Sequence, residues 1–326
     1  MSLRRISSGL ERIGRSANAS SRAREPRRGP PPHDSAPGAM ETVDVQTRDG
    51  RWLRATVREP SRTERARGVA VLAHAMFARR SQWERGFAAF LAERGWRTIA
   101  FDFRGHGDSG PAAAKGGSWS YEDLVRHDLP AVVDGARARA KGRKVVVVGH
   151  SLGGHVAAAA QATGAMEVDR IALVASNVWL RALEPSPVRF AAKTAVARSV
   201  EAVVDRRGFF PARALRLGSD DEAGPYMRHI WRAVSRGFWG SEDGRLDYWD
   251  ALRQLRTPLF ALSSDADPLN CHPECSARFA LRAVGPVTIE RLRAADDGGA
   301  APGHMEMLTT TASASAWGRM ERWLRG

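Results

Sequence analysis

Residues 144–154 read KVVVVGHSLGG, and this stretch gives the strongest indication of the fold. Its run of four valines predicts a β-strand that is buried on both faces. The motif G-x-S-x-G follows at once, and an alanine-rich helix is expected from Ser151 onward. So sharp a turn forces Ser151 into a strained conformation, while the flanking glycines let strand and helix approach closely. The stretch therefore predicts a serine hydroxyl exposed above a sheet, where it can act as a nucleophile.

Strands and helices alternate on both sides of this stretch. Asp49-Gly50 between two alternating runs predicts an antiparallel hairpin over residues 41–57. Further strands are expected at 69–74, 97–101, 171–174, 258–262 and 287–292, and helices near 81–94, 120–140, 272–284 and 312–325. This order indicates an α/β fold with a mostly parallel sheet and helices on both faces.

Residues 176–255 interrupt the alternation. They show no clear strand, and about 80 residues are too many for a plain loop, so we expect a helical insertion. The insertion is rich in aromatic residues, most of which should form its own core. A few are expected to face the serine as an apolar lid, because ligand pockets are lined mainly by such side chains.

The first 39 residues differ from the rest in composition. They are rich in Arg, Ser, Pro and Gly and poor in large apolar side chains, so we expect a disordered tail at 1–39 and one folded domain at 40–326. Three alternatives remain for the tail: an organelle transit peptide, a basic tether for an acidic partner, or a true start at Met40.

The net charge of +14 does not indicate a nucleic-acid partner. Eight arginines and three acids give residues 1–39 a charge of +5, and the remaining +9 is spread over the rest of the chain. No basic stripe alternates with stacking aromatics, as nucleic-acid binding would require. No apolar run approaches the roughly 18 residues that span a bilayer, so we expect no membrane span and a cytoplasmic location.

Two cysteines, Cys271 and Cys275, are too few for a disulfide framework. With His272 between them they suggest a metal site, but a structural site needs about four ligands and these three are crowded neighbours. Reduced thiols at the start of a helix are the simpler interpretation. No metal and no cofactor are expected.

A serine nucleophile needs a base, which follows it late in the chain in this fold. Beyond the strand at 258–262 the only histidines are His272 and His304. His272 opens a predicted helix, whereas His304 lies in the loop between the last strand and the last helix, which can reach Ser151. His304 is the predicted base.

The acid that orients the base should follow the strand at 258–262, where Asp265 and Asp267 are both candidates. We favour Asp267. The tetrahedral intermediate also needs two N–H donors. One should be the amide of Leu152, the residue after the nucleophile, and the other that of Met76, in the loop after the strand at 69–74.

Three further residues are of a type that could be catalytic, but their positions in the predicted order of strands and helices do not support such a role. Residues 107–111, GDSGP, are similar to the nucleophile region of chymotrypsin-like proteases, but here they follow a parallel strand, so Ser109 is expected to be a loop residue. His106 beside it should be structural. His74 precedes the serine in the chain and should support its own loop.

Five segments together resemble the α/β-hydrolase superfamily. They are VAVLAHAMFARRSQW from residue 69, IAFDFRGHGDSG from 99, VVVVGHSLGG from 145, LSSDADPLN from 262 and APGHMEM from 301. The similarity covers roughly residues 41–325 apart from the insertion. In the family the acid lies three residues after a Gly that follows the strand; Ser264 takes that position, which points to Asp267. The family usually has His-Gly in the oxyanion loop, where this chain has His74-Ala75.

The resemblance is greatest to bacterial predicted hydrolases and to monoacylglycerol-lipase or serine-aminopeptidase-like enzymes. It implies hydrolysis of a small carboxylic ester with an apolar acyl part, through an acyl-enzyme on Ser151. The alternatives are the same triad acting on an amide, thioester or C–C bond, or a ligand-binding protein of this fold without catalysis. The similar haloalkane dehalogenases would require an aspartate at Ser151.

Overall fold

The centre of the protein is an eight-stranded sheet in the order β1-β2-β4-β3-β5-β6-β9-β10. The strands are β1 (Met40–Gln46), β2 (Trp52–Arg58), β3 (Gly68–Ala73), β4 (Trp96–Phe101), β5 (Lys144–His150), β6 (Arg170–Val174), β9 (Leu259–Ser264) and β10 (Val287–Leu292). β2 pairs antiparallel with β1 and with β4, and all the other pairings are parallel. The predicted hairpin and mostly parallel sheet are confirmed.

The computed structural model describes residues 38–61, 66–84, 86–294, 300–310 and 313–326. The tail predicted at residues 1–39 lies outside this part of the chain except for its last two residues. None of the helices within the described ranges is long and apolar enough to cross a bilayer.

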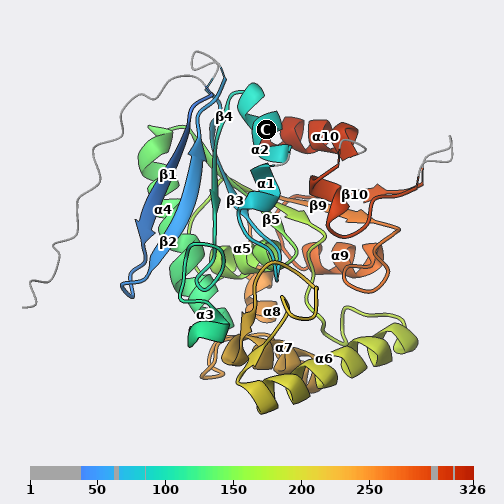
Figure 1. The fold of residues 1–326 in the computed structure, drawn as a ribbon. Coiled ribbons are helices and arrows are strands. Elements are labelled where there is room, and N and C mark those ends of the chain that lie inside the picture. Colours follow the sequence, from blue (N-terminus) through green and yellow to red (C-terminus); the bar gives the residue numbers. More distant parts are fainter. Residues whose placement is uncertain (1–37, 62–65, 85, 295–299, 311–312) are drawn as a thin grey trace, which may run out of the picture. The chain divides into compact units, whose positions relative to one another are not determined.

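Helices cover both faces of the sheet (Figure 1). Around the strands they are α1 (Ser81–Glu84), α2 (Phe87–Glu93), α3 (Tyr121–Asp123), the π-helix η3 (Leu124–Asp128), α4 (Leu129–Ala140), α5 (Leu152–Ala162), α9 (Pro273–Ala280) and α10 (Ala314–Arg325), with short 3-10 turns η2 (Ala113–Lys115) and η5 (Glu306–Leu308). α2 and α10 pack on one face, and α4 and α5 on the other.

The valines of β5 show why this strand carries no polar alternation. Val145 and Val147 enter the core beneath α4 and α5, whereas Val146 and Val148 enter the core beneath α2 and α10. All four are at most 1% exposed. A central strand covered by helices on both faces needs apolar residues at every position.

The segment between β6 and β9, residues 175–258, includes the predicted insertion at 176–255 and departs from the strand–helix rhythm. It contains α6 (Pro187–Arg207), β7 (Phe209–Phe210), β8 (Glu222–Ala223), α7 (Gly224–Arg236), α8 (Tyr248–Ala251) and the 3-10 turn η4 (Leu252–Gln254). β7 and β8 form a small antiparallel pair that the sequence analysis missed, because two-residue strands leave no periodicity to read. We call residues 175–258 the β6–β9 segment.

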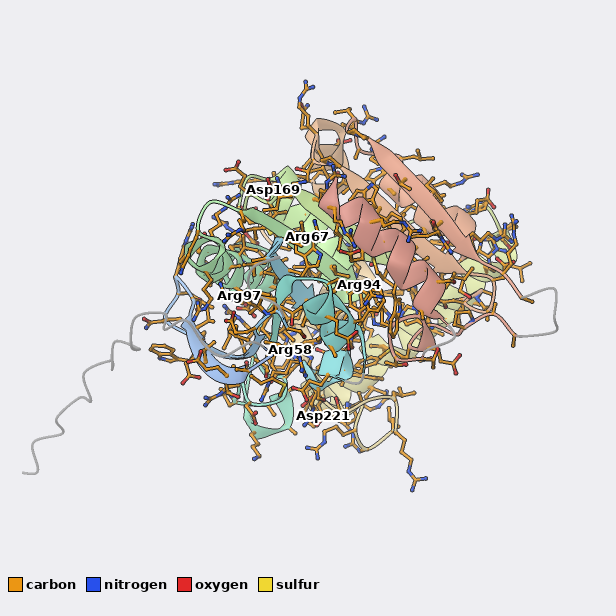
Figure 2. The ribbon with its side chains drawn as sticks, turned by 90° about the horizontal axis from the view of Figure 1, so that it is seen from above. Arg58, Arg67, Arg94, Arg97, Asp169 and Asp221 are labelled. Carbon is orange, nitrogen blue, oxygen red and sulfur yellow. The ribbon has the colours of Figure 1, made fainter. Side chains whose placement is uncertain are left out.

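Charged side chains are distributed widely. In the view from above, side chains ending in nitrogen project all around the outline of the protein rather than from one edge (Figure 2). Several arginines are neutralised locally: the guanidinium of Arg97, for example, donates to both carboxylate oxygens of Glu59, at 2.7 to 3.0 Å. This arrangement fits the sequence-based view that the charge is diffuse.

Candidate active site

The turn at Ser151 is held tight by glycines. Its backbone angles are φ 50° and ψ −111°, a region that residues with a side chain rarely adopt. A Cβ on Gly149 would lie 2.4 Å from the backbone of Gly153, and one on Gly154 would lie 2.0 Å from the Oγ of Ser176. Only glycine fits where β5 and α5 meet so closely, and this contact sustains the strain at Ser151.

The neighbouring strand fixes the backbone of Ser151. The amide of Ser151 donates to the carbonyl oxygen of Val174 at 2.8 Å, and the hydroxyl of Ser176 donates to the carbonyl oxygen of Ser151 at 3.0 Å. Ser151 itself remains partly exposed. The serine therefore lies at the carboxyl edge of the sheet, rigid in its backbone and open to solvent.

The imidazole of His304 lies against the carboxylate of Asp267. Nδ1 of His304 is 2.5 Å from Oδ2 of Asp267, and the two side chains are 17% and 2% exposed. Asp265, the alternative from the sequence, instead pairs with Arg291. Of the two candidate carboxylates, only that of Asp267 contacts the histidine.

His150 ties the loop of His304 to the turn that carries Ser151. Nε2 of His150 donates to the carbonyl oxygen of His304 at 2.9 Å, and Nδ1 accepts from the amide of Gln82 at 3.2 Å. Burial, and then the neighbouring His304, lower the pKa of His150 to about 3, so its ring is neutral and has one donor and one acceptor. The imidazole centroids of His150 and His304 are 5.1 Å apart. The structure thus brings His304 beside the residue that precedes Ser151.

Sequence reasoning missed His150 and Gln82. A polar side chain immediately before the nucleophile was visible, but its partners lie 68 and 154 residues away in the chain. No local pattern identifies contacts at such a separation.

The loop after β3 approaches the first turn of α5. The amide of Gly153 donates to the carbonyl oxygen of His74 at 3.1 Å. Leu152 is the first residue of α5, so its N–H has no acceptor within the helix. Within the described ranges, no hydrogen bond takes up the N–H of Leu152 or that of Met76.

His74 supports this loop, as the sequence analysis expected. Nδ1 is 2.7 Å from the carbonyl oxygen of Ala75, and Nε2 accepts the amide N–H of Phe103 at 3.0 Å. Burial lowers its pKa well below the ordinary value. A fully buried, neutral ring with both nitrogens engaged cannot serve as a general base.

The other rejected candidates also have structural contacts. The hydroxyl of Ser109 donates to the carbonyl oxygen of Asp102 and accepts the amide of Arg54, both at 2.8 Å. His272 caps α9, with Nδ1 accepting the amide of Glu274 at 3.2 Å. Both side chains serve local structure, which agrees with the sequence-based interpretation.

One group of potential metal ligands occurs in the described part of the chain, formed by Asp49, Asp123 and His127. The guanidinium of Arg104 lies among these groups, 2.8 Å from Asp49 and 3.4 Å from Asp123. The arginine thus supplies the positive charge that these carboxylates attract. The cluster fastens the β1–β2 turn to α3.

Comparisons with known proteins bear on the family and the fold of this chain. The family described as serine aminopeptidase, S33, matches residues 64–290. No curated protein sequence matches the chain. Among solved structures, the esterase EaEST from Exiguobacterium antarcticum is 17% identical with a TM-score of 0.59, covering 88% of this chain and 100% of that one.

Two further solved structures have a similar fold. DcsB, in complex with its substrate analogue, is 14% identical with a TM-score of 0.62, covering 88% of this chain and 98% of that one. The monoacylglycerol lipase of Paleococcus ferrophilus is 16% identical with a TM-score of 0.55, with the same coverages of 88% and 98%. At such identities the likeness concerns the fold alone.

Proposed function

Because the chain belongs to the serine aminopeptidase S33 family of α/β hydrolases, we propose that it is a serine hydrolase that cleaves a carboxylic ester through an acyl-enzyme. The observation that carries this proposal is the hydrogen bond between His304 and Asp267, in a loop tied through His150 to the turn of Ser151. In support, Ser151 and Asp267 follow the carboxyl ends of β5 and β9, and Asp267 contacts His304.

The proposed roles follow from the donors and acceptors at each atom. Nδ1–H of His304 donates to Asp267, which leaves the lone pair of Nε2 for the hydroxyl proton of Ser151. Oγ of Ser151 attacks the ester carbonyl carbon, and the proton moves to Nε2. His304 then protonates the leaving alkoxide as the ester C–O bond breaks. A water molecule, deprotonated by the same nitrogen, releases the acid and restores Ser151.

The negative oxygen of the tetrahedral intermediate would be bound by the amides of Met76 and Leu152. Both N–H groups lack an acceptor in the described chain, and the amide of Leu152 adds the positive end of the α5 dipole. Each such donor accounts for about 10²–10³ in rate in enzymes of this type.

The β6–β9 segment would act as the lid over an apolar acyl group. Two of its aromatic residues reach the loops of the candidate site. The ring of Phe210 stacks on Phe77 with centroids 5.6 Å apart, and Nε1 of Trp179 donates to the carbonyl oxygen of Asn270 at 3.2 Å. Contacts of this kind fit a small ester whose acyl part is apolar.

A second candidate activity is cleavage of an amide by the same residues, which the aminopeptidase description of the family favours. Amides, thioesters and C–C bonds would all use the same nucleophile, so the fold does not select among them. Parallel assays with p-nitrophenyl esters, thioesters and aminoacyl arylamides discriminate by relative kcat/KM.

The test of the proposed function is Ser151→Ala. Turnover of a short p-nitrophenyl ester should fall by about 10⁶, because the nucleophile is lost. Ser199→Ala is the matched control, since Ser199 is exposed on α6 and donates only to the carbonyl oxygen of Ala195. Wild-type turnover in Ser151→Ala would eliminate the proposal.

A further inference from the structure

The β6–β9 segment is hydrogen-bonded to the loop after β3 at Phe77. This residue has φ 63°, unusual for a residue with a side chain. Its amide donates to Oε1 of Glu222 at 2.9 Å, and its carbonyl oxygen accepts the amide of Ser219 at 2.7 Å and the Ser219 hydroxyl at 3.1 Å. A Cβ on Gly218 would lie 2.3 Å from the Cβ of Phe77, so glycine is required for this approach. The N–H and the C=O of Phe77 are thus both hydrogen-bonded to residues more than 140 positions away in the chain.

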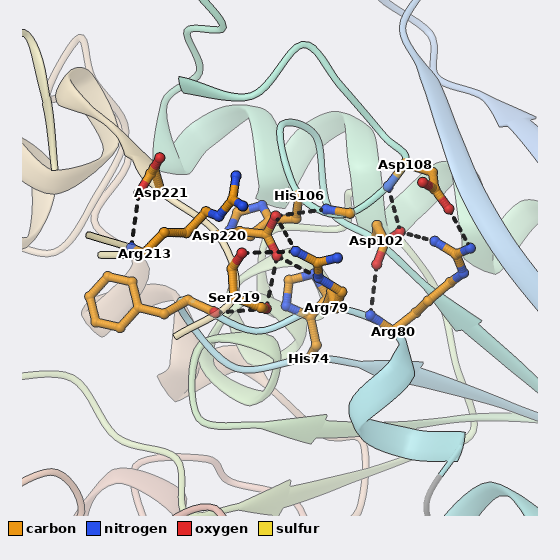
Figure 3. A network of polar contacts seen from close by, with 12 residues as sticks. His74, Arg79, Arg80, Asp102, His106, Asp108, Arg213, Ser219, Asp220 and Asp221 are labelled. Carbon is orange, nitrogen blue, oxygen red and sulfur yellow. Dashed lines mark hydrogen bonds and ion pairs between the residues drawn. The ribbon is translucent and has the colours of Figure 1, made fainter. Parts of the chain in front are cut away.

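A second contact between the segment and the loop is the ion pair of Arg79 with Asp220, the residue after Ser219 (Figure 3). The guanidinium of Arg79 donates to both carboxylate oxygens of Asp220, at 2.9 and 3.0 Å, and to the carbonyl oxygen of Ser219 at 2.8 Å. Asp220 also accepts the amide of Gly107 at 3.2 Å. A bidentate pair fixes direction as well as distance. It therefore constrains the loop on the far side of Phe77.

Glu222 is in turn held by His106, and both side chains are fully buried. Nε2 of His106 is 3.0 Å from Oε1 of Glu222, and Nδ1 is 3.0 Å from the carbonyl oxygen of Arg104. Both ring nitrogens face acceptors, so both must donate and the ring is an imidazolium. Burial opposes this charge, but the carboxylate of Glu222 outweighs it and raises the pKa of His106 to about 9.

The groups around His106 agree with this assignment. Asp220 adds a second negative charge on the side of the β6–β9 segment. His74, with its ring centroid 5.0 Å away, is neutral and adds no repulsion from the side of β3. The charged pair thus joins the loop after β4, which carries His106, to the β6–β9 segment, which carries Glu222.

We propose that Glu222 and Asp220 are positioning residues for the oxyanion hole, an inference that rests on the proposed function. Phe77 directly follows Met76, the proposed donor. The hydrogen bond from the amide of Phe77 to Glu222 and the ion pair of Arg79 fix the backbone that follows Met76, and with it the direction of the Met76 amide. The oxyanion hole is then complete only when this segment is docked on the loop.

The test compares Glu222→Gln and Asp220→Asn with a matched control, Asp221→Asn. Asp221 lies between the two, but its carboxylate accepts the amide of Arg213 within the segment and does not touch the loop. The rate of p-nitrophenyl ester hydrolysis is divided by the concentration of sites titrated with a fluorophosphonate. We expect kcat per site to fall about 10- to 100-fold in both variants with KM changed less than threefold, since a displaced donor loses part of the roughly 10²–10³ assigned to it. Asp221→Asn should stay within about twofold.

A pH profile separates positioning from general destabilisation. In the wild type the charge on His106 is lost as the pH rises through about 9, so kcat should fall there. In Glu222→Gln the largest cause that raises the pKa of His106 is lost, and only Asp220 and the carbonyl oxygen of Arg104 still oppose the burial of the ring, so the step near pH 9 should move to lower pH.

The outcomes are distinguishable from failure of the proposed function. Wild-type kcat per titrated site in both Glu222→Gln and Asp220→Asn, while Ser151→Ala is inactive, would overturn the inference and leave the function standing. If Glu222→Gln does not fold, Asp220→Asn alone decides, because it leaves the charged pair intact. Activity in Ser151→Ala would remove the function and the inference together.

Discussion

Replacing Asp267 by Asn tests the proposed charge behind His304. The substitution keeps the size of a side chain that is 2% exposed and removes its charge. In the reaction an imidazolium forms on His304, with charge centres about 4 Å apart; at an effective dielectric constant of about 20 this attraction is about 4 kcal/mol. That energy corresponds to about 10³ in kcat at about 1.4 kcal/mol per decade. An amide can also hold the ring in the wrong tautomer, which moves the expected loss toward about 10⁴.

The matched control is Asp265→Asn. Its carboxylate is 33% exposed and pairs with Arg291 at the surface, so its loss should cost at most about 1 kcal/mol of stability and leave kcat within about twofold. The assay is kcat for a short p-nitrophenyl ester, corrected for titrated active sites, with Tm measured alongside. Equal kcat in the two variants, or an Asp267→Asn enzyme within tenfold of wild type, would refute the reasoning.

Three further substitutions follow from particular contacts. His150→Phe removes the donor to the carbonyl oxygen of His304, so kcat per titrated site should fall by about 10- to 100-fold, with a lower Tm because Gln82 and this carbonyl lose a buried partner; wild-type kcat would contradict this. Gly154→Ala places a Cβ 2.0 Å from the Oγ of Ser176 and should cost about 1–3 kcal/mol in urea unfolding, partly recovered by Ser176→Gly; an unchanged unfolding midpoint would count against it. Burial lowers the pKa of His229 to about 3, below its unfolded value, so this residue's contribution to stability is present above pH 6.5 and is lost as the pH falls toward 3. His229→Phe, which keeps the stacking on Tyr121, should reduce the acid slope of unfolding free energy by about 1.4 kcal/mol per pH unit, and an unchanged slope would disprove this.

Local patterns in the sequence predicted most of the fold. The valines of β5, buried on alternate faces, and β10, with the predicted bounds 287–292, needed only periodicity and flanking turns. The predicted helix at 120–140 is present, but Leu124–Asp128 is a π-helix. Its wider turn depends on tertiary packing, which no periodicity encodes.

Local patterns also predicted part of the candidate site, but not the contacts that depend on tertiary packing. Each predicted residue lies in a short motif or directly after a predicted strand, so topology alone led to the prediction of Ser151, Asp267 and His304, and the structure shows the contact between the last two. The contacts of His150 and Glu222 join loops more than 100 residues apart and depend on how the β6–β9 segment docks. The sequence predicted that this segment is a helical insertion rich in aromatic residues, but it did not predict where the side chains lie.

The most direct measurement of the central claim is the site of covalent modification. The protein is reacted with a fluorophosphonate at equimolar concentration, digested and mapped by mass spectrometry. We expect one adduct per chain, on the hydroxyl of Ser151, and simultaneous loss of ester hydrolysis. Full inactivation with the adduct on another residue, or hydrolysis that continues after Ser151 is modified, would contradict it.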